Sequence, residues 1–247
     1  MANESTESFG PYLLQELLAS GEAADVWSAV REGAATPVII KRLLPPWTRT
    51  LALQKTFLEV VKDIIAVRHD NIVSLLDFGQ DGEVLYVVFE KVEGVFLRSL
   101  IRARQPLEAA QFSAIASGLL NGLALLHRSQ NQFTGRQLVH GDVSPGNVMI
   151  DASGRPRIAD IGFSRVVLEA GLPGKPAVLD KRYIAPEVLA GGVLSTRSDV
   201  FGAGMILNDL AELVSAEGIS CFAEVRQRAS AALPAGHPGG SQATGEA

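Results

Sequence analysis

The side chains best suited to chemistry in this sequence are gathered in one short stretch, VHGDVSPGNVMID at residues 139–151. An imidazole (His140), a carboxylate (Asp142) and an amide (Asn147) follow one another there, and apolar residues enclose them on both sides. We interpret the stretch as a loop pinned between core segments, a kind of loop that often carries a protein's chemistry. Asp and Asn beside Pro-Gly are also common in ordinary turns, so the stretch alone supports either interpretation.

Four further motifs surround this stretch in a fixed order along the chain. They are VIIK at 38–41, ADIGFSR at 159–165, YIAPEVL at 183–189 and SDVFGAG at 198–204. Taken singly, each has a plain structural explanation: Lys41 could simply end a strand, and Asp160 before Gly162 could form a turn. The order of the five motifs is far more specific than any one of them.

In this order the motifs resemble those of the protein kinase superfamily, most closely the bacterial Ser/Thr kinases of eukaryotic type, also called Hanks-type kinases. The resemblance runs from about Gly10 to about Val214, most of the chain. It implies an α+β fold with two lobes, an antiparallel sheet plus one helix in the first and helices in the second. It also makes His140 a structural residue and Asp199 a brace for the loop of residues 139–151.

The roles that the resemblance implies fit the chemistry of phosphoryl transfer, which depends on positioning and charge neutralisation more than on covalent help. Lys41 would hold the α- and β-phosphates of ATP. Asn147 and Asp160 would supply the hard oxygen ligands that Mg²⁺ prefers. Asp142 would accept the proton of a substrate hydroxyl. We therefore expect Asp142 and Lys41 to be catalytic, with ATP and Mg²⁺ as cofactors.

The resemblance also implies an adenine pocket, carried by the stretch LYVVFEKVEG. Phe89 would lie at its back, and the backbone from Glu90 to Val92 would read the adenine edge. Val26 and Met149 would form its roof and floor. Plain core packing explains each of these apolar residues equally well.

The Gly-rich loop of the family is reduced in this chain. Residues 19–26 read ASGEAADV, so only Gly21 remains of the three glycines. Glycine lets the backbone approach phosphates and adopt positive φ. Since alanine still has an N–H to donate, we expect weaker closure over the phosphates rather than none.

The acidic residue that should orient the lysine is displaced. The family's position falls on Val60, and Glu59 comes one residue early. One residue is about 100° around a helix. We predict that Lys41 meets Glu59, or Asp63 as a fallback, in a helix that is rotated relative to that of an active kinase.

Two further departures concern regulation. Gly141 replaces the arginine of the H-R-D motif, and residues 165–183 contain no Ser or Thr, so switching by Ser/Thr phosphorylation of this segment is not expected. Asp180 stands where the family has a threonine near the catalytic Asp142. A second carboxylate there would oppose the developing negative charge.

The elements that must position these residues form two predicted units, 10–94 and 95–233, followed by a disordered tail at 234–247. Hydrophobic periodicity predicts strands within 12–44, 71–79, 84–92 and 155–160, and helices at 50–67, 107–127, 199–214 and 222–233. Few residues follow Asp199, so we expect the helical unit to be shortened.

The composition bounds the class of protein. The chain has 247 residues, 47% of them hydrophobic, and a net charge of −5, which argues against a nucleic-acid partner. Cys221 is the only cysteine, which excludes an internal disulfide. The first residues lack the apolar core of a signal peptide, and we expect no segment to reach the roughly 20 apolar residues of a membrane helix. We expect a cytoplasmic protein with a protein substrate or partner.

Three interpretations stay open. In the first, the chain is an active Ser/Thr kinase, a transferase in bacterial signalling, with slow transfer. In the second, it is a kinase-like module that binds a nucleotide or a partner and transfers little. In the third, it phosphorylates a small molecule, as some enzymes with an HGD motif do, but YIAPEVL is typical of protein kinases.

Overall fold

The computed structural model describes residues 7–21, 24–45, 47–131, 135–163, 165–166 and 180–214. The expected helix at 222–233, the expected tail and the expected shortening of the helical unit all concern residues outside these ranges.

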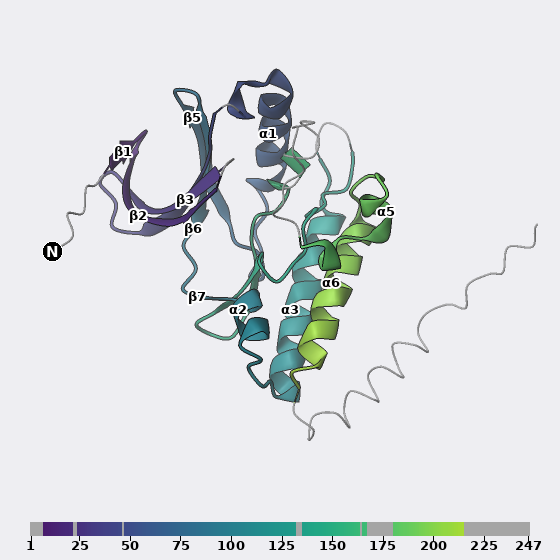
Figure 1. Cartoon of the computed structure of the whole chain (residues 1–247). Helices are drawn as coiled ribbons and strands as arrows, with labels where there is room; N and C mark the ends of the chain where they lie inside the picture. The colour runs from purple at the N-terminus through teal and green to yellow at the C-terminus, as the bar shows by residue number, and fades with distance from the viewer. Residues whose placement is uncertain are drawn as a thin grey trace, which may run out of the picture.

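The first lobe is a curled antiparallel sheet with one helix beside it (Figure 1). The strand order is β1-β2-β3-β4-β6-β5. The strands are β1 (Glu7–Phe9), β2 (Tyr12–Ser20), β3 (Ala24–Arg31), β4 (Pro37–Leu43), β5 (Leu75–Asp81) and β6 (Val84–Glu90). The three strands predicted within 12–44 and the later pair are confirmed, whereas β1 was not predicted.

Strand register brings the expected nucleotide-binding residues to one face. Val26 on β3 lies opposite Lys41 on β4, and Ile39 lies opposite Phe89 on β6. Side chains alternate between the two faces of a strand, so Ile39 and Lys41 share a face. Paired residues share a face as well, which places Val26 and Phe89 on that same side.

Helix α1 (Leu51–Ile64) begins where the Thr50 side chain accepts a hydrogen bond from the Leu53 N–H, as an N-cap residue does. One broad face of the helix is apolar and packs into the main core, and its members include Phe57, Val60 and Val61. Burial of this face, more than helix propensity, stabilises the helix. The predicted helix at 50–67 is confirmed.

The second lobe is built on two long helices, α3 (Ala109–Arg128) and α6 (Thr196–Ala211), which lie side by side in Figure 1. A small antiparallel sheet, β7-β8-β9, packs through β9 against the middle of α3, and its strand β8 forms the end of the stretch 139–151. The remaining elements are β7 (Gly94–Phe96), α2 (Leu97–Arg102), β8 (Val148–Asp151), β9 (Pro156–Ile158) and α5 (Pro186–Leu189), with single 3₁₀ turns η1 (Trp47–Arg49) and η2 (Lys181–Tyr183).

Two glycines let α3 lie directly on β9. A Cβ atom at Gly118 would lie 2.4 Å from Pro156 Cγ, and one at Gly122 would lie 2.8 Å from Ile158 Cδ1. Real side chains do not approach so closely, so only glycine permits this packing. The close contact fixes β9 and, with it, Asp160 at the start of the next turn.

Helix α3 is long and apolar enough, by length and composition, to cross a membrane. The expectation that no segment would reach this length is therefore wrong. A core helix passes the same test, and here Phe112, Ile115, Leu119, Leu123 and Leu126 are buried in the main core. This single helix is weak support for a membrane segment.

The two-lobed α+β fold is confirmed. A single cluster of buried side chains extends from α1 and β6 of the first lobe to α3 and α6 of the second. The two lobes therefore share one hydrophobic core.

Candidate active site

Lys41 and Asp160 meet although they lie far apart in the sequence. Lys41 Nζ is 3.0 Å from Asp160 Oδ2, and both side chains are mostly shielded from solvent. Asp160 has a φ of +59°, and Gly162 follows with +72°, so the turn lies in the left-handed region that few residues adopt. Backbone bonds on each side hold this turn, from Gly162 N to His140 O and from Ala159 N to Asn147 O.

Asp142 and Asn147 form a second pair within the loop of residues 139–151. Asn147 Nδ2 donates to Asp142 Oδ2 at 2.7 Å and to its backbone oxygen at 2.9 Å. Burial raises the pKa of the Asp142 carboxyl, and the nearby Asp160 adds to this rise. His140, Asn147 and Lys41 act in the opposite direction.

The buried carboxylate of Asp199 holds the loop from behind. It accepts hydrogen bonds from the backbone N–H groups of His140 (2.7 Å) and Gly141 (2.9 Å), and the His127 ring lies at 2.9 Å. His140 is fully buried, and its ring nitrogens bond to Ala159 O and to the N–H of Asp142. These contacts support the structural roles expected for His140 and Asp199.

Gly141 has a physical reason to be glycine. Its φ is +84°, and a Cβ atom there would lie 3.0 Å from Leu194 Cδ1. A side chain at this position would therefore be strained by its backbone and crowded by its neighbour.

The predicted partner of Lys41 on α1 is wrong. Among the described residues, Lys41 pairs with Asp160 only, while Glu59 lies 3.8 Å from Arg165 and Asp63 accepts a hydrogen bond from Asn131. Val60 is the residue of α1 that faces the site, since its Cγ1 would lie 2.7 Å from a Cβ atom on Gly162. The contact between Val60 and Gly162 fixes this rotation, which leaves Glu59 outside the site.

The expected adenine-binding residues lie on three strands. Val26 is opposite Lys41 on β3, and Met149 on β8 pairs with Arg157 on β9. Phe89 is buried in the main core, and Val92 packs against that core from the segment after β6. Whether these residues bind adenine stays a prediction.

Arg157 on β9, which was not among the predicted site residues, contacts Glu90 at the end of β6 and Ile72 before β5. Its guanidinium lies 2.5 Å from Glu90 Oε1 and donates to Ile72 O at 3.1 Å. Glu90 Oε1 also accepts from the Ser74 N–H at 2.7 Å. Glu90 Oε1 is thus occupied, and the backbone N–H of Glu90 donates to Ser74 O at 3.1 Å. The available signal was a basic residue inside the predicted strand at 155–160.

Gly21 and Asp180 lie at the edges of the described site. Gly21 donates its N–H to Ala24 O at 2.9 Å and so closes the turn between β2 and β3, while residues 22–23 are outside the described ranges. Asp180 caps the 3₁₀ turn η2 by accepting from the Arg182 N–H. The role of Gly21 at phosphates and the closeness of Asp180 to Asp142 stay predictions.

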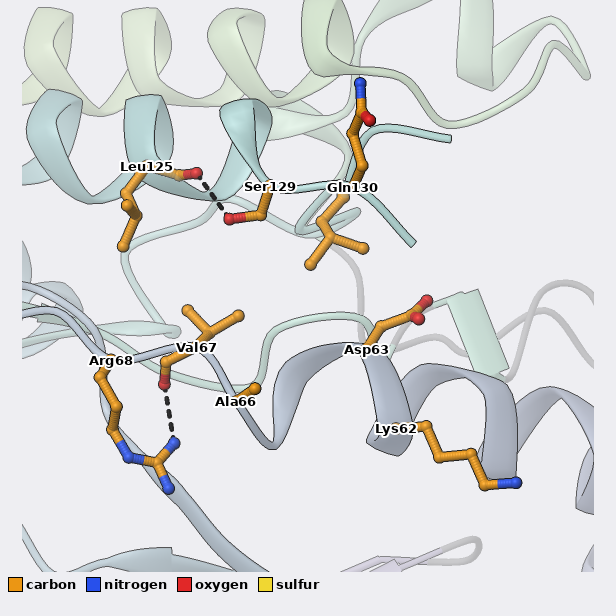
Figure 2. Close-up of a pocket in the computed structure, with 9 residues that line it drawn as sticks. Lys62, Asp63, Ala66, Val67, Arg68, Leu125, Ser129 and Gln130 are labelled. Carbon is orange, nitrogen blue, oxygen red and sulfur yellow. Dashed lines mark hydrogen bonds between the residues drawn. The ribbon is translucent and has the colours of Figure 1, made fainter. Parts of the chain in front are cut away.

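A large cavity lies away from this site. Its volume is about 500 Å³, and it lies between Asp63 near the end of α1, with Val67 after that helix, and Leu125 near the end of α3, with Ser129 after it (Figure 2). None of the residues predicted to be catalytic, metal-binding or nucleotide-binding lines it. We therefore place the candidate active site at the polar residues around Lys41 and Asp142 and not at this cavity.

The donor set fits Mg²⁺ held jointly with a ligand. Among the described residues no group of three or more His, Cys, Asp or Glu could hold a metal by itself. Asp160 uses Oδ2 to bind Lys41, and Asn147 uses Nδ2 to bind Asp142, so the Oδ1 atom of each residue is left for a cation. Mg²⁺ is usually held by one or two carboxylates together with substrate phosphates, and these residues would serve that arrangement.

Comparison with known proteins agrees with this geometry. A family model described as protein kinase domain matches residues 12–227. The serine/threonine-protein kinase PrkC of Bacillus subtilis is 28% identical over 202 residues, covering 81% of this chain and 30% of that protein. The serine/threonine-protein kinase PknL of Mycobacterium tuberculosis is 29% identical over 200 residues, covering 81% and 48%. This chain thus spans about a third to a half of the length of these relatives.

A solved structure shows the same fold. The crystal structure of the Mycobacterium tuberculosis PknI kinase domain superimposes with a TM-score of 0.64 at 22% sequence identity, covering 83% of this chain and 76% of that one. At this identity the match supports the fold alone.

Proposed function

This chain belongs to the protein kinase family, and from that premise we propose that it is an ATP-dependent protein Ser/Thr kinase with slow transfer. The proposed substrate is a hydroxyl group on a protein, and the proposed location is the cytoplasm. The serine/threonine kinases among its relatives support this class of reaction.

The proposed roles follow the geometry. Lys41 binds the α- and β-phosphates of ATP, and Asp142 accepts the proton of the attacking hydroxyl. Asp160 and Asn147 would hold Mg²⁺, which when bound neutralises phosphate charge.

The proposed nucleotide contacts complete the site. Val26 and Met149 enclose adenine, the backbone from Glu90 to Val92 binds its edge, and Gly21 lies near the phosphates.

One observation carries the proposal: the four polar residues that phosphoryl transfer needs come together from three separate segments of the chain. Lys41 pairs with Asp160 at 3.0 Å, Asn147 pairs with Asp142 at 2.7 Å, and Asp160 acts on the pKa of Asp142. Such a constellation combines a cation for phosphates, ligands for a metal and a base within one site.

A second candidate function is a nucleotide- or partner-binding module with little or no transfer. It is favoured by the position of Glu59, which pairs with Arg165 and leaves Lys41 without a carboxylate from α1. Loss of that partner and of two Gly-rich-loop glycines could each cost about one to two factors of ten in rate, or roughly 1.4–2.8 kcal/mol of barrier.

The test is a transfer assay with radiolabelled ATP and Mg²⁺ on the purified protein, with casein as a generic acceptor. We expect label on Ser or Thr, at a rate well below the roughly 1–100 s⁻¹ of typical protein kinases. Asp142→Ala is the control and should abolish the signal. Equal labelling by wild type and Asp142→Ala would reject transfer and leave the binding module.

A further inference from the structure

Phe163 places an aromatic ring against the amine of Lys41. The residue directly follows the Asp160–Gly162 turn, and Lys41 Nζ lies 4.1 Å from the centroid of its ring. The ring is buried, with 6% of the residue exposed. A cation within about 6 Å of the face of an aromatic ring is attracted by the negative face of the ring, and burial strengthens this attraction.

The other partner of Lys41 has a competing task. Among the described residues, Asp160 is its only carboxylate, because α1 turns Val60 and not an acid toward the site. Asp160 is also the proposed ligand of Mg²⁺, and a bound cation would take up part of its negative charge. The ring of Phe163 binds no metal, so its attraction for the amine stays when Mg²⁺ and ATP are present.

We propose that Phe163 is the positioning residue for Lys41, in the role that a carboxylate on α1 does not fill. This inference rests on the proposed function, in which Lys41 binds the phosphates of ATP. An ammonium group has three N–H donors, of which Asp160 accepts one. The ring attracts the charge without accepting a conventional hydrogen bond, so it holds the amine while the other donors remain available to phosphate oxygens.

The competing explanation is that Phe163 only fills the core. A ring that merely packs would contribute equally to the binding of any ligand that needs an intact site. A ring that positions Lys41 would matter only for ligands that carry phosphates, and only while Lys41 is present. These two consequences can be measured separately.

The first experiment is calorimetric titration of Mg·ATP and of adenosine into wild type, Phe163→Leu and Phe163→Tyr. Leucine keeps an apolar side chain without a ring, and tyrosine keeps the ring. We expect Phe163→Leu to weaken Mg·ATP by about 2- to 30-fold and to leave adenosine unchanged. Phe163→Tyr should restore Mg·ATP to within about twofold of wild type.

Phe57→Leu is the matched control, because Phe57 on α1 is buried in the same core cluster and has no contact with a cation among the described residues. Phe57→Leu should change the affinities for Mg·ATP and for adenosine by the same factor. Equal weakening of Mg·ATP and adenosine by Phe163→Leu, or no rescue by tyrosine, would overturn the proposal.

The second experiment needs no nucleotide. Urea unfolding of wild type, Phe163→Leu, Lys41→Met and the double variant forms a double-mutant cycle. We expect the effects on the unfolding equilibrium constant to be non-additive by about twofold or more, since the pair interacts only when both members are present. Additive effects would overturn the proposal even if ATP does not bind. Coupling in a protein that transfers no phosphate would instead reject the proposed function and leave this inference standing.

Discussion

Burial raises the pKa of the Asp142 carboxyl above its ordinary value of 3.8. This shift affects both the catalytic role of Asp142 and the stability of the protein. A base works best when its pKa is close to the working pH, because the proton transfer then costs less free energy. The same burial makes the charged carboxylate less stable in the folded chain than in the unfolded chain. Function and stability are therefore opposed at Asp142.

Asp142→Asn should separate these two effects. We expect transfer to fall by about 10²- to 10⁴-fold, since the base is lost, while the free energy of unfolding at pH 7 rises. The wild-type carboxylate has a raised folded pKa, so its cost is present above that pKa and disappears as the pH falls toward 3.8. Urea unfolding of both proteins from pH 7 downward should show the stability gap narrowing. A gap that widens with falling pH would contradict the raised pKa.

At the scale of elements, the rotation of α1 decides which side chain faces Lys41. Val60 lies against Gly162, whereas Glu59 is nearly half exposed and pairs with Arg165. An exposed pair of this kind contributes little to stability. In this arrangement Glu59 therefore makes a weak surface pair with Arg165, and Lys41 pairs with Asp160 instead.

Glu59→Gln tests this arrangement. We expect the KM for ATP and the transfer rate to change by less than about threefold, since only an exposed ion pair is lost. Lys41→Met, measured beside it, should remove ATP-dependent activity. A loss of tenfold or more in Glu59→Gln would mean that α1 rotates in the working state and brings Glu59 to Lys41.

Replacing a glycine by alanine should lower the free energy of unfolding where α3 packs on β9 and raise it at an open position of α6. Gly118→Ala would force a Cβ atom to within 2.4 Å of Pro156 and should lower the free energy of unfolding by about 1–3 kcal/mol. Gly204→Ala, in the middle of α6, meets no atom within 4 Å and should raise it by about 0.5–1 kcal/mol, because alanine favours helix. Chemical denaturation measures both. Equal effects would show that α3 can move away from β9.

At the scale of the whole molecule, the site exists only because two lobes share one core. Lys41 comes from the sheet of the first lobe, and Asp142 from the second. Arg157 adds a polar connection across the same boundary through Glu90 and Ile72. A ligand that contacts both Lys41 and Asp160 can therefore bind only when the two lobes are packed together.

Mg·ATP binding tests this assembly. We expect a Kd of tens to hundreds of micromolar, or roughly −5 to −6 kcal/mol, because the metal ligands are present and the Gly-rich loop is reduced. Asp160→Asn should remove most of the Mg²⁺ dependence. Calorimetric titration with and without Mg²⁺ measures both quantities. No heat at millimolar ATP, or an unchanged Mg²⁺ dependence in Asp160→Asn, would contradict the assignment.

Much of this protein could be predicted from sequence alone, because the information is local. Asp142 and Asn147 lie five residues apart in one loop, so their pairing needs only that loop. The strands from Tyr12 to Leu43 and helix α1 follow from short-range periodicity. Lys41 and Asp160, which are 119 residues apart, were joined by the order of motifs, which carries information about the fold that no single segment contains.

Only the tertiary structure decided how these parts face one another. The apolar face of α1 is broad, and several rotations would bury a similar set of side chains, so periodicity could not choose between Glu59 and Val60. Packing against Gly162 made the choice. The ring of Phe163 at Lys41 and the guanidinium of Arg157 at Glu90 are likewise contacts between distant segments. The sequence determines local structure, such as the position of α1 along the chain. The rotation of that helix about its axis depends on the shapes of all the side chains packed against it.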